Sequence, residues 1–288
     1  MGKVLVIDVA KCIGCLSCVV ACKDEFVNND WTPYSKPQPE YGAFWIKVDA
    51  RERGTTPKVR VTYTPILCMH CDNAPCIKAC PVNAITKRAD GIVLIEPSKC
   101  NGCRSLETGP LCMKACPYEV VYFNEQLGIV QKCTLCAHLL DDPNWKYGPR
   151  CYDACPIEAI LYGDENDPKI KEQMNKASVL HPEYNAKPRV YYLNLPQPFI
   201  TGSIVDPDLK EVIVNAKVTA IDLYTSKKYE AYTDEFGDFW LKNLEWNHRY
   251  LVMVEKEGYG KRTLGIYITN QDLNLQVINL RRGEGRKP

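Results

Sequence analysis

The chain has 288 residues, and 36 lysines and arginines against 35 aspartates and glutamates leave a formal net charge of +1. This length predicts about two domains. The balanced charge creates no field that would attract nucleic acid or an anionic membrane, and no apolar stretch approaches the roughly 20 residues that cross a bilayer. We therefore expect neither a nucleic-acid-binding protein nor a direct membrane span.

Sixteen cysteines, all before residue 156, form four groups of four with a shared spacing. Each group opens with C-x-x-C and closes with C-x-x-x-C, and only the gap between these two halves changes. In chain order the groups are Cys12, Cys15, Cys18, Cys22; Cys68, Cys71, Cys76, Cys80; Cys100, Cys103, Cys112, Cys116; and Cys133, Cys136, Cys151, Cys155. Since a [4Fe–4S] cluster takes four thiolates, the sixteen cysteines predict four such clusters.

The first group follows a β-prone run, Val4–Val9, and has the C-x2-C-x2-C-x3-C spacing of bacterial ferredoxins. In that run the fourth cysteine ligates the other cluster. Proline follows the last cysteine of the three later groups, where it prevents a helix from continuing. Lys23 takes this place in the first group, so the chain must turn differently there.

Residues 28–64 form an insertion between the first two groups. It is rich in aromatic residues: Trp31, Tyr34, Tyr41, Phe44 and Trp45. The insertion could shield a cluster or dock a partner, and simple packing over the cluster-bearing domain is an equally good interpretation.

The central block resembles a two-cluster bacterial ferredoxin. It runs from Cys80 through an Asp90-Gly91 turn signal to the next C-x-x-C, with β-prone residues on both sides. Exchange of the fourth ligand, as in those ferredoxins, predicts two complete ligand sets. These sets are Cys68, Cys71, Cys76 with Cys116, and Cys100, Cys103, Cys112 with Cys80.

The character of the chain changes after residue 165. A short helix is expected around residues 169–177, within a proline-punctuated linker of residues 166–198. Residues 199–288 hold seven short β-like runs and predict an antiparallel sandwich. Thr233–Leu241 resembles the strand–turn–strand of transthyretin-like, carboxypeptidase-regulatory-type domains. This part has no cysteine and only an isolated His248, so we expect no chemistry there. The fold class is thus α+β, with a cluster domain over residues 1–165 and a C-terminal all-β sandwich.

Zinc and disulfides are the alternatives to iron–sulfur clusters. Three cysteines within seven residues suit a cluster better than one tetrahedral ion, and disulfides belong to small proteins of oxidising compartments.

Basic residues near the groups could raise cluster potentials, or could be ordinary solvated charges. They are Lys11, Lys78, Lys99, Arg104, Lys114 and Lys132. Apolar neighbours are expected to keep water away from the sulfur atoms: Ile13, Leu16, Ile66, Ile77, Leu111 and Leu135.

Four ferredoxin-type groups in one chain resemble the iron–sulfur subunits of molybdopterin enzymes of the dimethyl-sulfoxide-reductase family. The segments ERGTTPKVRVTYTPILCMHCDNAPC, QKCTLCAHLLDD and KPRVYYLNL, with the transthyretin-like end, look most like the small subunit of pyrogallol–phloroglucinol transhydroxylases. This resemblance implies that the outer groups exchange ligands. It implies the sets Cys12, Cys15, Cys18 with Cys155, and Cys133, Cys136, Cys151 with Cys22.

The resemblance also implies a function: relaying single electrons to or from a large catalytic subunit that holds molybdenum or tungsten on molybdopterin and acts on a phenolic substrate. The transhydroxylase pattern has an incomplete cysteine complement, whereas all sixteen positions are filled here, which favours a relative with net redox chemistry. A redox-neutral transhydroxylase, another molybdopterin reductase and a free polyferredoxin carrier stay open as alternatives. We expect no catalytic or substrate-binding residue in this chain. The N-terminus shows no export signal, so we expect a cytoplasmic protein, or a periplasmic one if its partner is exported.

Overall fold

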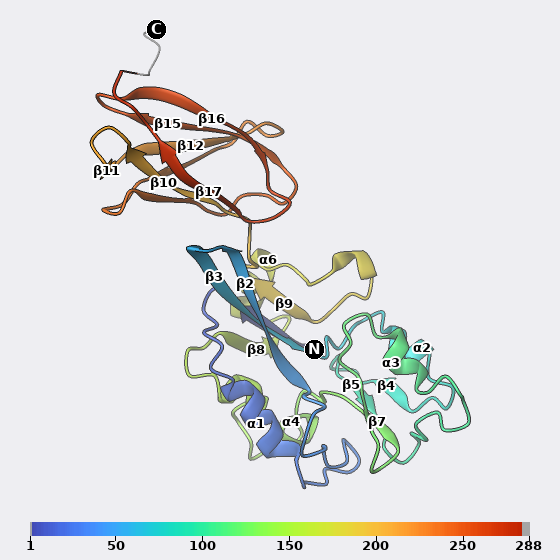
Figure 1. Cartoon of the computed structure of the whole chain (residues 1–288). Coiled ribbons are helices and arrows are strands. Elements are labelled where there is room, and N and C mark those ends of the chain that lie inside the picture. The colour runs from blue at the N-terminus through green and yellow to red at the C-terminus, as the bar shows by residue number, and fades with distance from the viewer. Residues whose placement is uncertain (1, 284–288) are drawn as a thin grey trace. The chain divides into compact units, whose positions relative to one another are not determined.

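The structure is a computed structural model that describes residues 2–283. It contains two compact units (Figure 1). The first unit comprises residues 2–50 and 62–195 and holds every cysteine. The second comprises residues 51–61 and 196–283. A segment of the aromatic insertion therefore belongs to the C-terminal unit, which the sequence did not indicate.

A three-stranded sheet joins the two ends of the cysteine-bearing region. Strand β1 (Lys3–Asp8) pairs antiparallel with β8 (Ile160–Asp164) and parallel with β9 (Val190–Leu193). Four consecutive β1 residues, Val4 to Ile7, are at most 1% exposed, as expected for a central strand that is apolar on both faces. Because β1 precedes the first cysteine group and β8 follows the last, this sheet brings those two groups together.

Three β-hairpins fill the space between the cysteine groups: β2 (Ile46–Thr55) with β3 (Lys58–Leu67), β4 (Ile85–Lys87) with β5 (Val93–Ile95), and β6 (Tyr122–Asn124) with β7 (Ile129–Gln131). The second strand of each hairpin precedes the next cysteine group along the chain. The expected Asp90-Gly91 turn joins β4 to β5, and Gly91 adopts φ +87°, a conformation that suits glycine.

The helices of the first unit are short, and most carry or follow a cysteine. They are α1 (Ser17–Phe26), α2 (Pro75–Lys78), α3 (Leu111–Ala115), α4 (Ala137–Leu140), α5 (Arg150–Asp153) and α6 (Pro168–Lys176). Helices α2, α3 and α5 each end just before a Cys-Pro pair. Helix α1 instead continues through Cys22 and Lys23 to Phe26, because no proline stops it.

Much of the segment expected as a linker is ordered within the first unit. Helix α6 lies where a helix was expected, and Asp167 accepts a hydrogen bond from Lys169 N (2.8 Å) at its start. Strand β9 pairs with β1 because its alternating residues Val190 and Tyr192 are buried, each 1% exposed. The proline-rich surroundings hid this strand from the sequence reading. Among the described residues, no helix has both the length and the apolar character needed to span a bilayer.

The second unit is a β-sandwich, and the expectation of a purely antiparallel one is wrong because its last strand, β17, pairs parallel with β10. One sheet contains β11 (Glu211–Val212), β10 (Ile200–Asp206), β14 (Asp238–Leu241) and β17 (Leu273–Asn279), and the other contains β13 (Lys228–Tyr232), β12 (Lys217–Asp222), β15 (Arg249–Lys256) and β16 (Gly260–Ile268). Residues such as Ile204, Phe239 and Val252 from the two sheets form one buried apolar core. The tip of the β2–β3 hairpin is part of this unit because Arg53 forms a two-pronged ion pair with Asp272 (2.6 and 2.9 Å).

Candidate functional site

Four sets of four thiols can be defined in the first unit. Set 1 is Cys12, Cys15, Cys18 and Cys155; set 2 is Cys22, Cys133, Cys136 and Cys151; set 3 is Cys68, Cys71, Cys76 and Cys116; set 4 is Cys80, Cys100, Cys103 and Cys112. The four cysteines of set 1 line one cavity, those of set 3 a second, and those of set 4 a third. The cavities measure about 330, 340 and 280 Å³, including space open to solvent. Each cavity thus combines three cysteines of one group with one from a distant group.

The cysteines of set 2 come together between two helices. Helix α1, which carries Cys22, packs against α5, which carries Cys151. Burial raises the pKa of Cys22 well above its usual value, and the neighbouring thiols of Cys133, Cys136 and Cys151 raise it further. All four side chains are buried.

Electrostatic influence between thiols also gives the order of the sets. After burial, the causes that raise the pKa of Cys151 include Cys18, which links set 2 to set 1. The thiol of Cys68 raises the pKa of Cys133 in the same way, which links set 2 to set 3. The thiol of Cys76 raises the pKa of Cys112, which links set 4 to set 3. The helices agree with two of these links, because α1 carries both Cys18 and Cys22, and Cys76 on α2 is four residues from Cys80. The four sets therefore adjoin in the order 1–2–3–4.

The buried thiols are poor acids until something stabilises their anions. Burial raises the pKa of Cys18 and Cys76 to about 11 and that of Cys71 and Cys112 to about 12. A metal bound to sulfur stabilises the thiolate, and this offsets the cost of burying the negative charge. Sulfur donors converging on one space suit iron–sulfur clusters, so the residues fit the cofactor that the sequence predicted. Among residues 2–283, no group of three or more His, Cys, Asp or Glu side chains is arranged to hold a single metal ion.

Backbone N–H groups donate to several of the sulfur atoms, through a turn that repeats along the chain. Ala84 N donates to Cys80 Sγ and Ala159 N to Cys155 Sγ, both at 3.3 Å. In both turns proline follows the cysteine, and the residue before the donor has a positive φ. Further N–H donors reach Cys100, Cys133 and Cys136. Hydrogen bonds of this kind tune cluster potentials.

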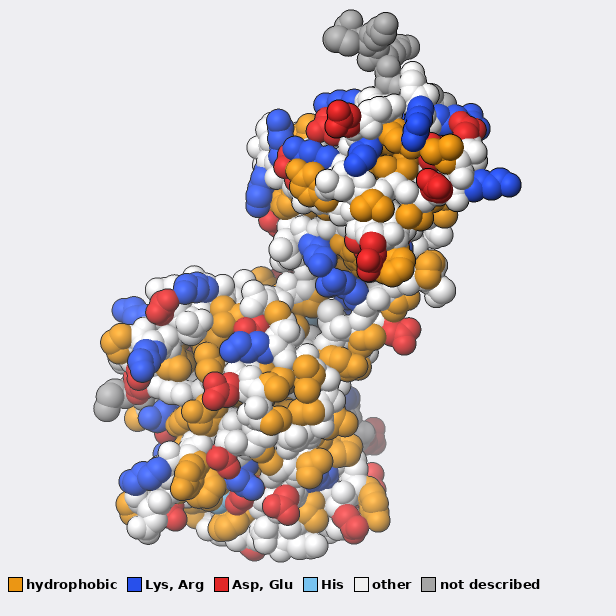
Figure 2. Space-filling model, turned by 90° about the vertical axis from the view of Figure 1, so that its left-hand side faces the viewer, with side chains coloured by type: hydrophobic (Ala, Val, Ile, Leu, Met, Phe, Trp, Pro, Cys, Tyr) orange, Lys and Arg blue, Asp and Glu red, His pale blue; other side chains and the backbone are white. Residues whose placement is uncertain are grey.

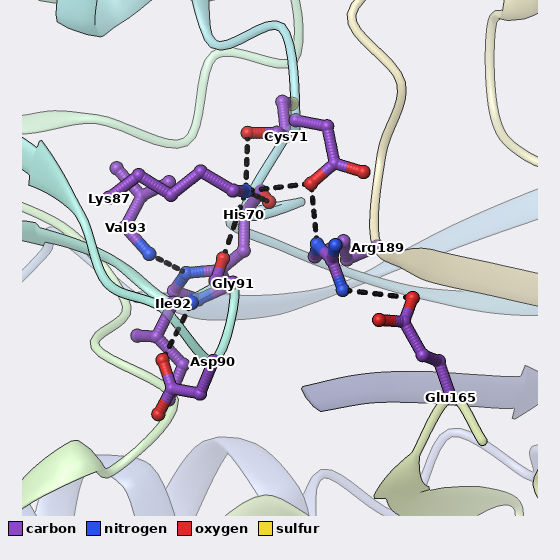
Figure 3. Close-up of polar contacts among 10 residues, drawn as sticks. His70, Cys71, Lys87, Asp90, Gly91, Ile92, Val93, Glu165 and Arg189 are labelled. Carbon is purple, nitrogen blue, oxygen red and sulfur yellow. Dashed lines mark hydrogen bonds and ion pairs between the residues drawn. The ribbon is translucent and has the colours of Figure 1, made fainter. Parts of the chain in front are cut away.

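A polar network supports the loop that carries set 3 (Figure 3). Lys87 Nζ donates to the carbonyls of His70, Cys71 and Gly91 at 2.9–3.0 Å. Its charge is paired with Asp72 at 2.9 Å, and Arg189 joins the same carboxylate at 2.5 Å. These contacts hold the backbone between Cys68 and Cys71 against the β4–β5 turn.

His70 is the buried histidine of this network. Its Nδ1 accepts from Val93 N at 3.0 Å, so Nε2 carries the proton, and Nε2 finds no hydrogen-bond partner among residues 2–283. Burial drives the pKa of His70 well below its usual value, and nearby cations act in the same direction. The ring is therefore neutral.

The aromatic insertion packs over the fourth cysteine group. Trp31 stacks on His138 with ring centroids 4.3 Å apart, and Phe26 contacts Trp45 at 4.6 Å. Gln131 Nε2 donates to the carbonyls of Lys36 (2.9 Å) and Pro37 (3.0 Å). Packing therefore accounts for the inner aromatic residues of the insertion. Two others are exposed: Tyr41 by 83% and Phe44 by 44%.

Set 1 is the thiol set most open to solvent. Cys15 is the exposed one among the sixteen cysteines, and hydrogen bonding to Ser17 lowers its pKa. Ile13 and Leu16 line the cavity of set 1, as expected of apolar neighbours, although they are themselves 61% and 48% exposed. Leu135, beside set 2, is buried as expected.

Five of the six basic residues singled out from the sequence are solvated. Side chains of both charges are scattered over the face drawn in Figure 2, as the net charge of +1 leads one to expect. Lys11, Lys78, Lys99, Arg104 and Lys114 are exposed. Lys132 is the exception, with 2% of its side chain exposed.

The second unit holds one polar pair that the sequence reading missed. His248 is not isolated, because its Nδ1 lies 2.7 Å from Asp222 Oδ2. Asp222 also accepts from the backbone N–H of Tyr224 at 2.8 Å. The residues are 26 positions apart, and only the pairing of β12 with β15 brings them together.

Known families match three parts of the chain. Residues 11–84 and residues 59–165 each match a 4Fe-4S dicluster domain, and residues 200–281 match the carboxypeptidase regulatory-like domain. The chain therefore contains two ferredoxin-like 4Fe-4S dicluster domains followed by a regulatory-like β domain.

Curated relatives agree with this assignment. The small subunit of pyrogallol hydroxytransferase from Pelobacter acidigallici is 46% identical over 141 residues, which are 49% of this chain and 48% of the relative. The putative iron–sulfur subunit of dimethyl sulfoxide reductase from Halobacterium salinarum is 39% identical over 168 residues, 48% of this chain and 58% of the relative. The iron–sulfur subunit of arsenate respiratory reductase from a Shewanella species is 42% identical over 120 residues, 42% of this chain and 44% of the relative.

The chain thus spans about half the length of the curated relatives it matches. The expected resemblance to iron–sulfur subunits of reductases and to the small transhydroxylase subunit is confirmed.

Proposed function

We propose that this chain is a non-catalytic electron-transfer subunit that relays single electrons through four [4Fe–4S] clusters. Sets 1 to 4 supply the ligands, one cluster to each set. The electrons pass to or from a large partner subunit that carries molybdopterin with molybdenum or tungsten and acts on a phenolic substrate. The complex works in the cytoplasm, unless an export signal on the partner takes it across the membrane.

One observation carries the proposal: cysteines far apart in the chain converge in fours, and the four sets adjoin in a line. A row of redox centres suits passage of electrons through a protein better than reaction with a substrate. The names of the relatives support the same conclusion, because they are small or iron–sulfur subunits.

When bound, each cluster supplies a centre that accepts and gives up one electron without forming a bond to substrate. The chain supplies the remaining requirements. The β1 sheet and the three hairpins hold the sulfur donors in position, and the N–H groups of Ala84 and Ala159 donate to sulfur. The buried set 2 is kept from water by α1, α5 and the aromatic insertion.

Purification of the complex under anaerobic conditions tests the proposal. A tag on this chain should recover a larger subunit that contains molybdopterin. The brown colour should bleach when dithionite is added, and the phenolic substrate should change the oxidation state of the clusters. If the chain is recovered alone and no molybdopterin subunit exchanges electrons with it, the subunit assignment is wrong.

A free polyferredoxin carrier is the second candidate. The exposed set 1, with Cys15 open to solvent, favours it because electrons could pass there to several partners. A carrier of this kind would reduce unrelated acceptors at similar rates and would not remain bound to one enzyme during gel filtration. A redox-neutral transhydroxylase would instead retain the partner but show no net reduction during turnover.

A further inference from the structure

Lys132 is a buried cation without a counter-ion among the described residues. Its side chain is 2% exposed. Its Nζ donates to Val93 O and, at 3.1 Å, to Cys133 O. Both acceptors are neutral carbonyls, and within residues 2–283 no carboxylate forms an ion pair with this ammonium. A buried charge that lacks an opposite charge is costly, so this position calls for an anion nearby.

The ammonium stands between set 2 and set 3. Cys133, whose carbonyl it contacts, belongs to set 2. Val93, its other acceptor, lines the cavity that holds set 3. Cys76 of set 3 lines the same cavity as Val93. The Lys132 ammonium therefore lies between set 2 and set 3, at the middle of the row of four.

The neighbouring cations differ from Lys132 because carboxylates neutralise them. Lys87 and Arg189 both pair with Asp72. Arg189 also pairs with Glu165 at 3.2 Å (Figure 3). Lys132 keeps its charge for whatever else is near. A [4Fe–4S] cluster with four thiolates is anionic, and the charges around it help to set its reduction potential.

We propose that Lys132 is the shared counter-cation of the clusters held by sets 2 and 3, and that its charge raises the reduction potentials of both. This inference rests on the proposed function. Because one charge acts on both centres, it raises the two potentials together and changes the difference between them little. Removal of the charge makes both clusters harder to reduce. The reduction potentials of the clusters at the more distant sets 1 and 4 change least.

The chain offers matched controls for this idea. Lysine also precedes the first cysteine of two other groups, as Lys11 and Lys99, and both of these are exposed. Lys132→Met keeps most of the side-chain volume and removes the charge. Lys11→Met and Lys99→Met remove the same charge from the same place in the repeat. Lys132→Arg keeps the charge.

The test is a redox titration of the anaerobic complex followed by electron paramagnetic resonance, with iron measured in each sample. In Lys132→Met two of the four potentials should fall, by about 59 mV if the reduction equilibrium changes tenfold. Lys132→Arg should stay close to the wild type, and the two exposed variants should shift all potentials little.

Four unchanged potentials in Lys132→Met, or an equal fall in Lys99→Met, would overturn the inference. Loss of iron from the Met and Arg variants alike would also overturn it, because packing rather than charge would then explain Lys132. Loss from the Met variant alone would support a required charge. If the wild type binds no iron, the proposed function fails first, and this result is distinct from unchanged potentials in an iron-loaded variant.

Discussion

The two units have interiors of different chemistry. In the second unit, apolar side chains from two sheets meet in one core. In the first unit, ten of the sixteen cysteines are buried, and they gather around the cavities instead of filling them. The second unit therefore resembles an ordinary sandwich stabilised by hydrophobic burial, whereas we expect the first to depend on bound iron and sulfide.

Removal of iron should have the largest effect of these experiments, because it should destabilise the first unit and leave the second unit stable. After anaerobic chelation, the amides of β1 and β8 should exchange hydrogen roughly 100-fold faster or more, because the buried thiols lose the groups that they surround. The amides of β15 should keep their protection. Hydrogen exchange followed by mass spectrometry measures both units in one sample, and equal loss in both would contradict the comparison.

Single cysteine substitutions sharpen the assignment of ligands within the first unit. Cys76→Ser and Cys116→Ser should each remove the same cluster signal, about four irons, and the double variant should remove no more. Cys76 and Cys80 are only four residues apart but belong to different sets, so Cys76→Ser combined with Cys80→Ser should remove two clusters. Iron analysis with electron paramagnetic resonance distinguishes these outcomes. A single lost cluster in the second pair would refute the ligand exchange.

The opposite experiment weakens the second unit. Phe239 is fully buried in its core, so Phe239→Ala should lower the free energy of unfolding of this unit by about 3–5 kcal/mol. Phe236 is 67% exposed, and Phe236→Ala should change it by about 0.5 kcal/mol or less. Visible absorption of the clusters should be the same in both variants. Bleaching in Phe239→Ala would mean that the two interiors are not independent.

The smallest expected effect is the loss of stability of the second unit at acidic pH, through Asp222. Burial acts to raise the pKa of Asp222, but hydrogen bonds from His248 and nearby N–H groups outweigh it and lower the pKa to about 2. Since the folded-state pKa lies below the unfolded one, the stabilisation is present above about pH 4 and is lost as the pH falls toward 2.

Asp222→Asn should therefore destabilise the second unit near pH 6, and its deficit against the wild type should shrink as the pH approaches 2. Hydrogen exchange in β12 and β15 at several pH values measures this. A deficit that does not change with pH would assign Asp222 a purely steric role.

The sequence predicted the parts that depend on local spacing. The β-prone run before the first cysteine group, the Asp90-Gly91 turn and the β-like runs after residue 199 all lie where the pattern placed them. Lys11, Lys99 and Lys132 look the same in the sequence, because each precedes the first cysteine of its group. Only folding distinguishes them: Lys132 is buried and donates to Val93 O and Cys133 O, whereas Lys11 and Lys99 are exposed.

Other features depend on contacts between distant residues. The His248–Asp222 pair and the Arg53–Asp272 pair join positions 26 and 219 residues apart, and no local pattern announces either. Strand β9 was hidden because its partner β1 lies at the other end of the unit. The departure at Lys23 was visible in the sequence, but the continuing helix that results from it required the structure.

Iron and acid-labile sulfide counted per chain, together with Mössbauer spectra of the anaerobic protein, address the whole account at once. Four cubanes require about 16 irons and an equal amount of sulfide, all in one type of spectrum. Zinc in place of iron, or about 8 irons spread over two cubanes, would show that the sixteen thiols do not form the row of centres from which every other conclusion follows.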